Sequence, residues 1–352
     1  MRVTLWRDDA VLARPVTASA QRHERRARLY LALEHDDVVG YGEVSPQPEA
    51  LNGDPSLDEV IHELEYVSVP QLLDVLTRES AAPGWARFNR FAGSRSASHA
   101  AVALVEMALL DRELRATNAT ASSIWPVHYA TPVQSTLSLL DPPGSWFVPP
   151  GVSRVRVKTA PGALGGEALE RLAGLGVGIV LDYNCSGANV AEVVSQAERL
   201  SAVTALDAVE QPFAPGNLIE HAQLARALHV AVSIDEGVRS WGDIHQIVRY
   251  ESATMICVKP ARVGGLANAR TFILRAREMG LRVYLGGFFE SPYARAVHRA
   301  LAEHCVSEPS DLGPVSVSGR AESDELDALE GGFAVTPSSH VLARSRVIGR
   351  WS

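Results

Sequence analysis

The stretch that decides the fold is residues 153–160, SRVRVKTA, and it has a counterpart at residues 177–184, VGIVLDYN. Each is a short run rich in β-branched residues that ends in charged or polar side chains, as a strand in a buried parallel sheet does. In the first run, valines alternate with Arg154, Arg156 and Lys158, so the three cations share one face of the strand. Because three cations in line repel one another, the sequence predicts that an anion meets them.

Runs of this kind recur along the rest of the chain, each followed by a stretch with helical spacing. They are VQSTLSLL (133–140), SRVRVKTA, VGIVLDYN, LDAVEQP (206–212), VAVSIDE (230–236), TMICVKP (254–260), LRVYLGG (281–287) and EHCVSEP (303–309). Strands that alternate with helices predict a parallel sheet with right-handed crossovers. Seven or eight such units in about 190 residues favour an α/β fold of the (β/α)8-type barrel class over an open doubly wound sheet.

The first part of the chain has a different pattern. Up to about residue 45 it contains short alternating segments, with a turn signal at Asp36 and Asp37, and helical spacing follows to about residue 111. We therefore predict an α+β domain at residues 1–125 and the barrel at residues 126–315. The remaining segment, residues 316–352, has no further strand–helix unit and is predicted to pack back on the first domain.

Composition and charge narrow the class of partner. Apolar residues make up 46% and charged residues 21% of the 352-residue chain, which is the usage of a globular protein. The formal charge of −8 argues against nucleic acid, and no apolar run reaches the ~20 residues that a membrane-spanning helix needs. A small molecule is the expected partner. We expect a cytoplasmic location because the N-terminal stretch lacks the apolar run of a signal peptide.

The three cysteines, Cys185, Cys257 and Cys305, are isolated in the sequence. Without CxxC spacing they indicate neither a disulfide framework nor a thiolate zinc site, so we predict three free thiols. Other motifs give no competing prediction. The glycines of GLGVGIV (174–180) precede a strand instead of following one, and the sequence has no HExxH or GxSxG pattern.

Ionisable residues fall at the C-terminal ends of the predicted strands, where a barrel carries its chemistry. In chain order they are Lys158, Asp182 with Asn184, Glu210, Asp235 with Glu236, and Lys259. A single acid at a strand end is usually a turn former or a helix N-cap, but this set recurs every 24 to 28 residues. The recurrence indicates a shared site at the barrel mouth.

Asp182, Glu210 and Asp235 would bring three carboxylates together on adjacent strands. Bare carboxylates repel one another at short range, and a divalent cation removes that repulsion. Oxygen ligands favour Mg²⁺ or Mn²⁺ over Zn²⁺, which prefers nitrogen and sulfur. We therefore predict a Mg²⁺ or Mn²⁺ site at this mouth.

Lys158 and Lys259 lie on either side of the predicted metal. Each could form a simple salt bridge with a neighbouring acid, or the α-proton of a metal-bound carboxylate substrate could lie between the two amines. A metal that takes up the developing enolate charge supplies several kcal/mol, and a positioned base contributes roughly 10²–10⁴-fold. Enzymes reach at least about 10⁶-fold, so both contributions are needed.

With these residues in place the chain resembles the enolase superfamily, in its muconate lactonizing enzyme and o-succinylbenzoate synthase branch. The resemblance rests on an ordered set of fragments that runs over most of the chain. They are GYGEVSP (40–46), AAVALVEMALLD (100–111), LDYN (181–184), VEQP (209–212), SIDE (233–236) and VKPARVGG (258–265). The family fold is a modified TIM barrel with an α+β capping domain, which here would be residues 1–125.

The resemblance also implies roles for individual residues. Asp182, Glu210 and Asp235 match the family's metal ligands, and Lys158 and Lys259 match its acid/base pair. The remaining matches are Asn184 as a polar residue near the metal, Glu236 as a partner of the ligands, and, in the seventh-strand loop GGFFES (286–291), Glu290 as an electrophile or orienter near the substrate. Phe288 and Phe289 either line the pocket or pack in the core.

Two departures from the family pattern bear on function. The usual Lys-x-Lys pair reads Arg156-Val-Lys158, and because an arginine does not titrate near neutral pH, Lys158 is the single base on its face. Arg156 could lower the pKa of that base or hold the substrate carboxylate, while Arg154 is expected at the strand start, away from the mouth. The Asp-x-Asp pair of dipeptide epimerases is not found in SEPSDLGPV (307–315), which counts against that activity.

We therefore predict a metal-dependent enzyme that abstracts the proton α to a carboxylate to give a metal-stabilised enolate. Racemisation, cycloisomerisation or dehydration would follow, as in N-acylamino acid racemases, muconate lactonizing enzymes and o-succinylbenzoate synthases. Two alternatives stay open: a barrel that binds metal and ligand without turnover, and a lyase in which Lys158 or Lys259 forms a Schiff base. The partner is a small-molecule carboxylate, and homo-oligomers are common among such enzymes.

Specificity in the superfamily depends on loops of the capping domain that close over the barrel. Here they would be about residues 17–25 and 47–54. The stretch ASAQRHERRAR (18–28) is unusually basic, which suggests a substrate with an acidic tail, although a solvated loop explains the charges as well.

Overall fold

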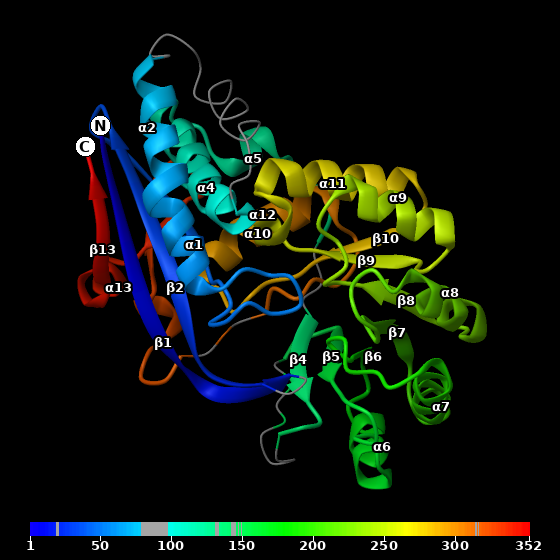
Figure 1. Cartoon of the computed structure of the whole chain (residues 1–352). Helices are drawn as coiled ribbons and strands as arrows, with labels where there is room; N and C mark the ends of the chain where they lie inside the picture. Colours follow the sequence, from blue (N-terminus) through cyan, green and yellow to red (C-terminus); the bar gives the residue numbers. More distant parts are fainter. Residues whose placement is uncertain are drawn as a thin grey trace.

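The computed structural model describes residues 1–18, 21–78, 98–130, 134–141, 146, 148, 150–313, 315 and 317–352. Its elements, in chain order, form an N-terminal α+β part, a strand–helix part and a C-terminal part (Figure 1). The N-terminal elements are β1 (Arg2–Ala18), β2 (Gln21–His35), β3 (Val38–Val44), α1 (Leu57–Glu63), the π-helical turn η1 (Leu64–Ser68), α2 (Val69–Arg78), α4 (His99–Ala116) and α5 (Ala121–Ile124).

The strands of the second part are β4 (Gln134–Ser138), β5 (Arg154–Lys158), β6 (Gly178–Asp182), β7 (Leu206–Glu210), β8 (Ala231–Ile234), β9 (Met255–Val258) and β10 (Arg282–Leu285). Its helices are α6 (Gly166–Ala173), α7 (Val190–Ser201), α8 (Leu218–Ala227), α9 (Trp241–Tyr250), α10 (Pro260–Val263), α11 (Leu266–Glu278) and α12 (Pro292–Cys305). The C-terminal elements are the 3₁₀ turn η3 (Glu322–Asp324), β11 (Leu326–Ala328), β12 (Val335–Pro337), α13 (Ser339–Arg344) and β13 (Arg346–Trp351).

The seven strands β4 to β10 form one sheet in sequence order, and every neighbouring pair is parallel. The sheet is curled and helices cover its outer side, which confirms the predicted modified TIM barrel (Figure 1). Because all the strands run in the same direction, their C-terminal ends meet at one mouth.

The eighth unit differs from its prediction. Residues 303–305 of the run EHCVSEP form the last residues of α12 rather than a strand. The gap between β10 and β4 is bridged by Ser310 and Asp311 instead, through the bonds Gln134 N to Ser310 O at 2.9 Å and Asp311 N to Leu285 O at 2.8 Å. Pro309 precedes this bridge and has no N–H to donate, which limits ladder pairing there.

The N-terminal part is built on a four-stranded antiparallel sheet in the order β13-β1-β2-β3. The chain termini therefore lie side by side, because the last strand pairs with the first (Figure 1). We keep the division into residues 1–125, 126–315 and 316–352 as a proposal. Two separate hydrophobic clusters support it, one centred on the barrel and one on the N-terminal sheet and α4.

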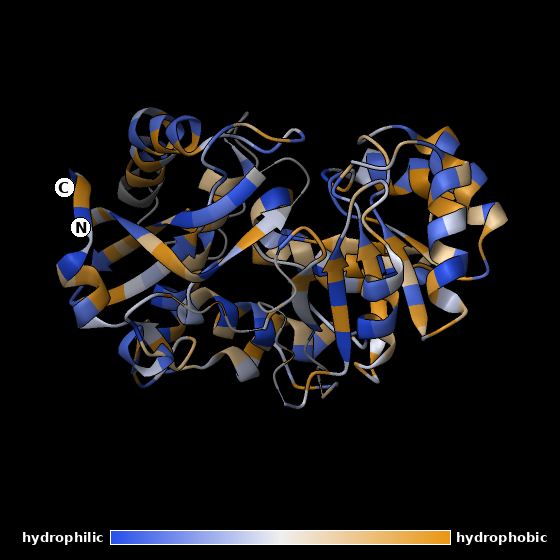
Figure 2. Ribbon diagram, turned by 90° about the horizontal axis from the view of Figure 1, so that it is seen from below, coloured by the Kyte–Doolittle hydropathy of each residue, from blue (hydrophilic) through white to orange (hydrophobic). Residues whose placement is uncertain are grey.

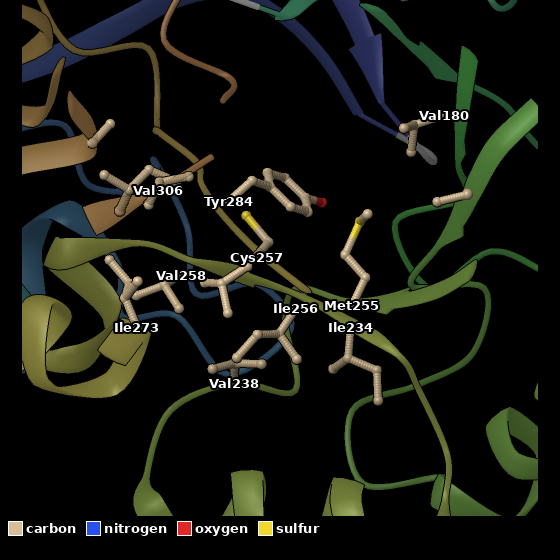
Figure 3. Close-up of a cluster of buried hydrophobic side chains, with 14 of the residues drawn as sticks. Val180, Ile234, Val238, Met255, Ile256, Cys257, Val258, Ile273, Tyr284 and Val306 are labelled. Carbon is tan, nitrogen blue, oxygen red and sulfur yellow. The ribbon is translucent and has the colours of Figure 1, made fainter. Parts of the chain in front are cut away.

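Hydrophobic residues are frequent along the barrel strands, where they are coloured orange in Figure 2. Val155 and Val157 are fully buried in the barrel cluster on one face of β5, so the cations of this strand share the other face. The same alternation holds in β9, where Ile256 points away from Cys257 (Figure 3). Among the described helices, none is long and apolar enough to cross a membrane.

Helix α4 joins the two parts of the molecule. Its buried Glu106 accepts hydrogen bonds from the backbone N–H groups of Leu266 and Ala267, and so caps the first turn of α11. Gly265 precedes that turn with φ of 116°, and a Cβ built there would lie 2.0 Å from a carboxylate oxygen of Glu106. Position 265 therefore needs glycine both for its backbone conformation and for its close approach to Glu106.

Gly265→Ala tests both requirements together, the backbone conformation and the close approach to Glu106. Gly280→Ala is the control that tests the backbone conformation alone. Gly280 also has positive φ, 87°, but a Cβ there meets nothing within 4 Å. We expect Gly280→Ala to lower the free energy of unfolding by about 1–2 kcal/mol through backbone strain, and Gly265→Ala by about 1–3 kcal/mol more through overpacking. Urea denaturation measures both losses, and equal losses would contradict the role assigned to Glu106.

Candidate active site

The residues selected from the sequence lie at the C-terminal ends of adjacent strands. Lys158, Asp182 and Glu210 are the last residues of β5, β6 and β7, and the strand register places Lys158 opposite Asp182 and Asp182 opposite Glu210. Asp235 directly follows β8, and Lys259 directly follows β9. Five parallel strands thus deliver one ionisable side chain each to the same mouth.

The three carboxylates converge on one guanidinium nitrogen. Nη2 of Arg156 lies 2.6 Å from Asp182 Oδ2, 3.3 Å from Glu210 Oε1 and 3.9 Å from Asp235 Oδ2. All three acids are fully buried. Asp182, Glu210 and Asp235 are therefore brought together as expected from the sequence. This cluster is the anion that meets Arg156 and Lys158, whereas Arg154 pairs with Glu308.

Of the three acids, Glu210 has the fewest hydrogen bonds and ion pairs among the described residues to offset the burial of its carboxylate. Both of its carboxylate oxygens are buried without a hydrogen-bond partner among the described residues, although Arg156 lies within ion-pair range. Burial raises the pKa of Glu210 from 4.5 to about 8 despite that guanidinium. A buried carboxylate with open acceptor sites, next to two further carboxylates, fits an oxygen-liganded divalent cation.

The two lysines pair with different acids. Nζ of Lys158 donates to Asp182 Oδ2 at 2.5 Å and to Asn184 Oδ1 at 2.7 Å, and Nζ of Lys259 donates to Asp235 Oδ2 at 2.8 Å. Burial lowers the pKa of Lys259, but Asp235 outweighs burial and the pKa lies above its ordinary value. In this arrangement Asp235 therefore holds the proton on Lys259.

Asn184 and Glu236 complete the polar ring on this side of the mouth. Nδ2 of Asn184 donates to Glu236 Oε1 at 3.1 Å, so the amide connects Lys158 to Glu236. Burial, with the neighbouring charges of Asp235 and Asp182, raises the pKa of Glu236. This residue lies beside the acidic cluster, as the sequence analysis expected.

Glu290 is placed differently from its prediction. It is 2% exposed, accepts a hydrogen bond from Phe288 N at 2.8 Å, and lies 3.5 Å from Arg295 Nε. Burial raises its pKa, but Arg295 and His298 outweigh burial and the pKa is lowered, so the group is ionised. The ionised side chain faces Arg295 and the backbone of Phe288 and so holds that loop in place, while its role toward substrate stays a prediction.

A cavity of about 920 Å³ opens above the cluster. Its floor includes Arg156, Lys158 and Lys259, and its wall includes Phe288 and Phe289, so these two aromatic residues line the pocket. Lys259 Nζ lies 4.6 Å from the ring centroid of Phe288, a cation–π contact that fixes the amine on one side of the cavity. The N-terminal part contributes a roof from residues 12–16, 23, 47, 51, 52 and 54.

Arg262 and Asp54 belong to the site but were not selected from the sequence. Arg262 donates through Nη1 to Asp235 Oδ1 at 2.5 Å, and through Nε and Nη2 to the two oxygens of Asp54 at 2.9 and 2.7 Å. Asp54 also accepts from Arg239 at 3.0 Å. Arg262 lies in the fragment VKPARVGG and Asp54 lies in the predicted lid. The two residues are 208 positions apart, so no local sequence pattern predicts that they pair.

The basic stretch of the lid is used mainly for structure. Arg26 is buried and donates to Gln47 and to three backbone carbonyls, one of them of Phe288, and Arg28 pairs with Glu325. His23 does line the cavity, and burial, helped by Arg26 and Lys158, lowers its pKa from 6.5 to about 4. Residues 19 and 20 lie outside the described residues. The charge of this stretch is therefore weak support for an acidic substrate tail.

The fold and these side chains define a barrel enzyme whose mouth gathers buried carboxylates between two lysines. A family model described as enolase C-terminal domain-like matches residues 165–331. An N-succinylamino acid racemase of Amycolatopsis sp is 27% identical over 349 residues, 96% of this chain and 92% of that protein. An o-succinylbenzoate synthase of Enterococcus faecalis is 33% identical over 64% of this chain and 59% of that protein.

The chain is thus similar, over most of its length, to enzymes of the enolase superfamily named as a racemase and an o-succinylbenzoate synthase. Among solved structures, the N-succinyl Arg/Lys racemase of Bacillus cereus superposes with a TM-score of 0.82 at 17% identity. That superposition covers 99% of this chain and 98% of the other, so the shared fold includes the N-terminal part as well as the barrel. Members of the superfamily bind a divalent metal ion.

Asp54→Asn tests how strongly the lid is tied to the site. Burial raises the pKa of Asp54, but Arg262 and Arg239 outweigh burial and lower it. Removing one partner of a buried ion pair costs about 3 kcal/mol, so we expect a loss of that size in the free energy of unfolding at neutral pH. The difference from wild type should shrink as the pH falls below about 4, because protonation removes the same charge from the native protein.

Urea denaturation at several pH values measures this loss. Asp9→Asn is the matched control, because Asp9 forms an ion pair with Arg7 at the surface, where its side chain is 47% exposed. The control should change the free energy of unfolding little, since exposed pairs contribute little. A small loss for Asp54→Asn, equal to that of the control, would mean that the lid is not held by this pair.

Proposed function

We propose that this enzyme abstracts the proton α to the carboxylate of a small organic acid, with the help of a divalent metal ion. The observation that carries the proposal is the placement of Lys158 and Lys259. Each amine contacts a different acid of one cluster, Asp182 or Asp235, and both line the same cavity. A substrate carbon held above the cluster would therefore have an amine on either side.

Asp182, Glu210 and Asp235 would hold the metal, and their oxygen donors favour Mg²⁺ or Mn²⁺. When bound, the ion would take up the negative charge that develops on the substrate carboxylate as the α-proton leaves. The open acceptor sites of Glu210 support this assignment. Glu236 and Asn184 would orient the acids, as their mutual hydrogen bond suggests.

The lysines would act as base and conjugate acid. Lys259 is held protonated by Asp235, and it would lose that restraint if a bound cation shared the charge of Asp235. An amine released in this way can accept the α-proton, while the opposite ammonium can return one. Position 156 on the cavity floor carries an arginine, which stays charged and would bind the substrate carboxylate.

Two amines on opposite sides suit racemisation, which needs a base and an acid across one carbon. The relatives named as N-succinylamino acid racemase and o-succinylbenzoate synthase suggest N-succinylamino acids and succinylbenzoate-type acids as first substrates. Cycloisomerisation and dehydration use the same first step, with one lysine as base and the other as electrostatic support. For Lys259 the Schiff-base alternative is disfavoured, because Asp235 raises the pKa of this amine and a protonated amine is not a nucleophile; for Lys158 the alternative stays open.

Exchange of the α-proton in D₂O tests the proposal. With Mg²⁺ and N-succinylamino acids, we expect wild type to exchange both enantiomers, followed by proton NMR. Lys158→Ala and Lys259→Ala should each lose exchange of one enantiomer by at least about 10²-fold, because a positioned base contributes that much. The two variants should lose opposite enantiomers. Unchanged exchange in both would favour the alternative in which the barrel binds ligands without turnover.

Arg156→Lys tests the competition between this side chain and the metal. The guanidinium contacts all three carboxylates, whereas an ammonium offers a single point charge. We expect Mg²⁺ to bind the variant about tenfold more tightly, which is about 1.4 kcal/mol, by isothermal titration calorimetry. Arg154→Lys is the control, because Arg154 contacts Gln134, Glu308 and Pro309 at the other end of β5. Equal affinities of both variants would show that Arg156 does not compete.

A further inference from the structure

Cys257 lies directly under the acidic cluster. It belongs to β9, two residues before Lys259, and its thiol is fully buried on the face of the strand away from Ile256, beside Tyr284 (Figure 3). Its sulfur and one oxygen each of Glu210 and Asp235 all lie within 4.8 Å of one another. The sequence predicts a free thiol at this position.

Glu210 gives a second, independent reason to expect a cation at this position. Its two carboxylate oxygens are buried and lack a hydrogen-bond partner among the described residues, and one of them belongs to the group with Cys257. A thiol is a weak donor and leaves such an acceptor largely unsatisfied. A cation seated between the sulfur and the carboxylates would compensate all three.

We propose that Cys257, Glu210 and Asp235 form a site for a soft divalent cation such as Zn²⁺ or Cd²⁺. A donor set of one sulfur and two oxygens differs from the all-oxygen set assigned to Mg²⁺, because thiolate ligands select the softer ions. On binding, the thiol releases its proton to solvent and a metal–sulfur bond forms, with no change of oxidation state. Three protein ligands leave the fourth tetrahedral position open.

The two sites share Glu210 and Asp235, so they exclude each other. A soft ion at Cys257 takes the oxygens that Mg²⁺ needs, and it displaces the ammonium of Lys259, which lies 2.8 Å from Asp235 Oδ2. It therefore inhibits the enzyme in two ways. This inhibition rests on the proposed function, whereas the binding site itself does not.

Cadmium absorption provides the test, because a thiolate–cadmium bond has a charge-transfer band in the ultraviolet that carboxylates alone do not give. Cys185 lines the cavity and could bind cadmium by itself, so the parent protein carries Cys185→Ser. We compare it with the same protein that also carries Cys257→Ser. Cys305→Ser is the matched control, because Cys305 is equally buried but lies in α12, where its thiol donates to Leu301 O.

We expect the band in the parent and in the Cys305→Ser control, with one equivalent of cadmium, and its loss in the Cys257→Ser variant. Glu210→Gln should weaken cadmium binding at least about tenfold, the lower end of what the loss of a metal's supporting group costs. A band that survives Cys257→Ser, or a parent without a band, overturns the proposal. Circular dichroism confirms that each variant is folded.

Measurements with added Mg²⁺ distinguish a failure of the cadmium site from a failure of the proposed function. If the function is right, excess Mg²⁺ should raise the cadmium concentration needed for half of the band, and Cys257→Ser should still be stabilised thermally by Mg²⁺. A cadmium band at Cys257 with no thermal stabilisation by Mg²⁺ in any variant would remove the proposed function and leave the soft site in place.

Discussion

Negative charge buried at the mouth of the barrel is the constraint on which the rest of the structure depends. Asp182, Glu210 and Asp235 are fully buried, and an ionised group taken out of water costs several kcal/mol unless a positive charge lies close to it. The chain supplies that charge through Arg156, Lys158, Lys259 and Arg262. Catalysis depends on this balance of charges, because two of the four cations, Lys158 and Lys259, are also the proposed acid and base.

The balance also joins the two parts of the molecule. Arg262 carries one positive charge and contacts two acids, Asp235 in the barrel and Asp54 in the loop above it. If that loop moved away, Arg262 would lose its contact with Asp54. Its whole charge would then interact with Asp235, and that ion pair would be stronger. The position of the lid therefore acts on the acid that pairs with Lys259, so closure over a substrate and the proton affinity of the amine are physically linked.

The fold and the site could be predicted from the sequence where a local pattern of residues determines the geometry. Seven or eight strand–helix units predicted the barrel, and one acid at the end of each of three units predicted the meeting of Asp182, Glu210 and Asp235, because parallel strands end at one mouth. Contacts could not be predicted from the sequence where they form only when two distant segments of the chain pack together. Asp54 and Arg262 meet only once the lid lies on the barrel, and the orientation of Glu290 depends on Arg295, one helical turn into α12.

Arg156 shows how one substitution in the family's Lys-x-Lys pattern can fit this balance. A guanidinium has five donors in a fixed plane, and here they reach Asp182 through Nε and Asp311 through Nη1 at 2.7 Å. Asp311 also lines the cavity, outside the acidic cluster. With a divalent cation shared among the carboxylates, Arg156 would keep Asp311 and turn its charge toward the cavity. The side chain that balances the cluster would then face the substrate carboxylate, a role that the single ammonium of a lysine could fill from only one position.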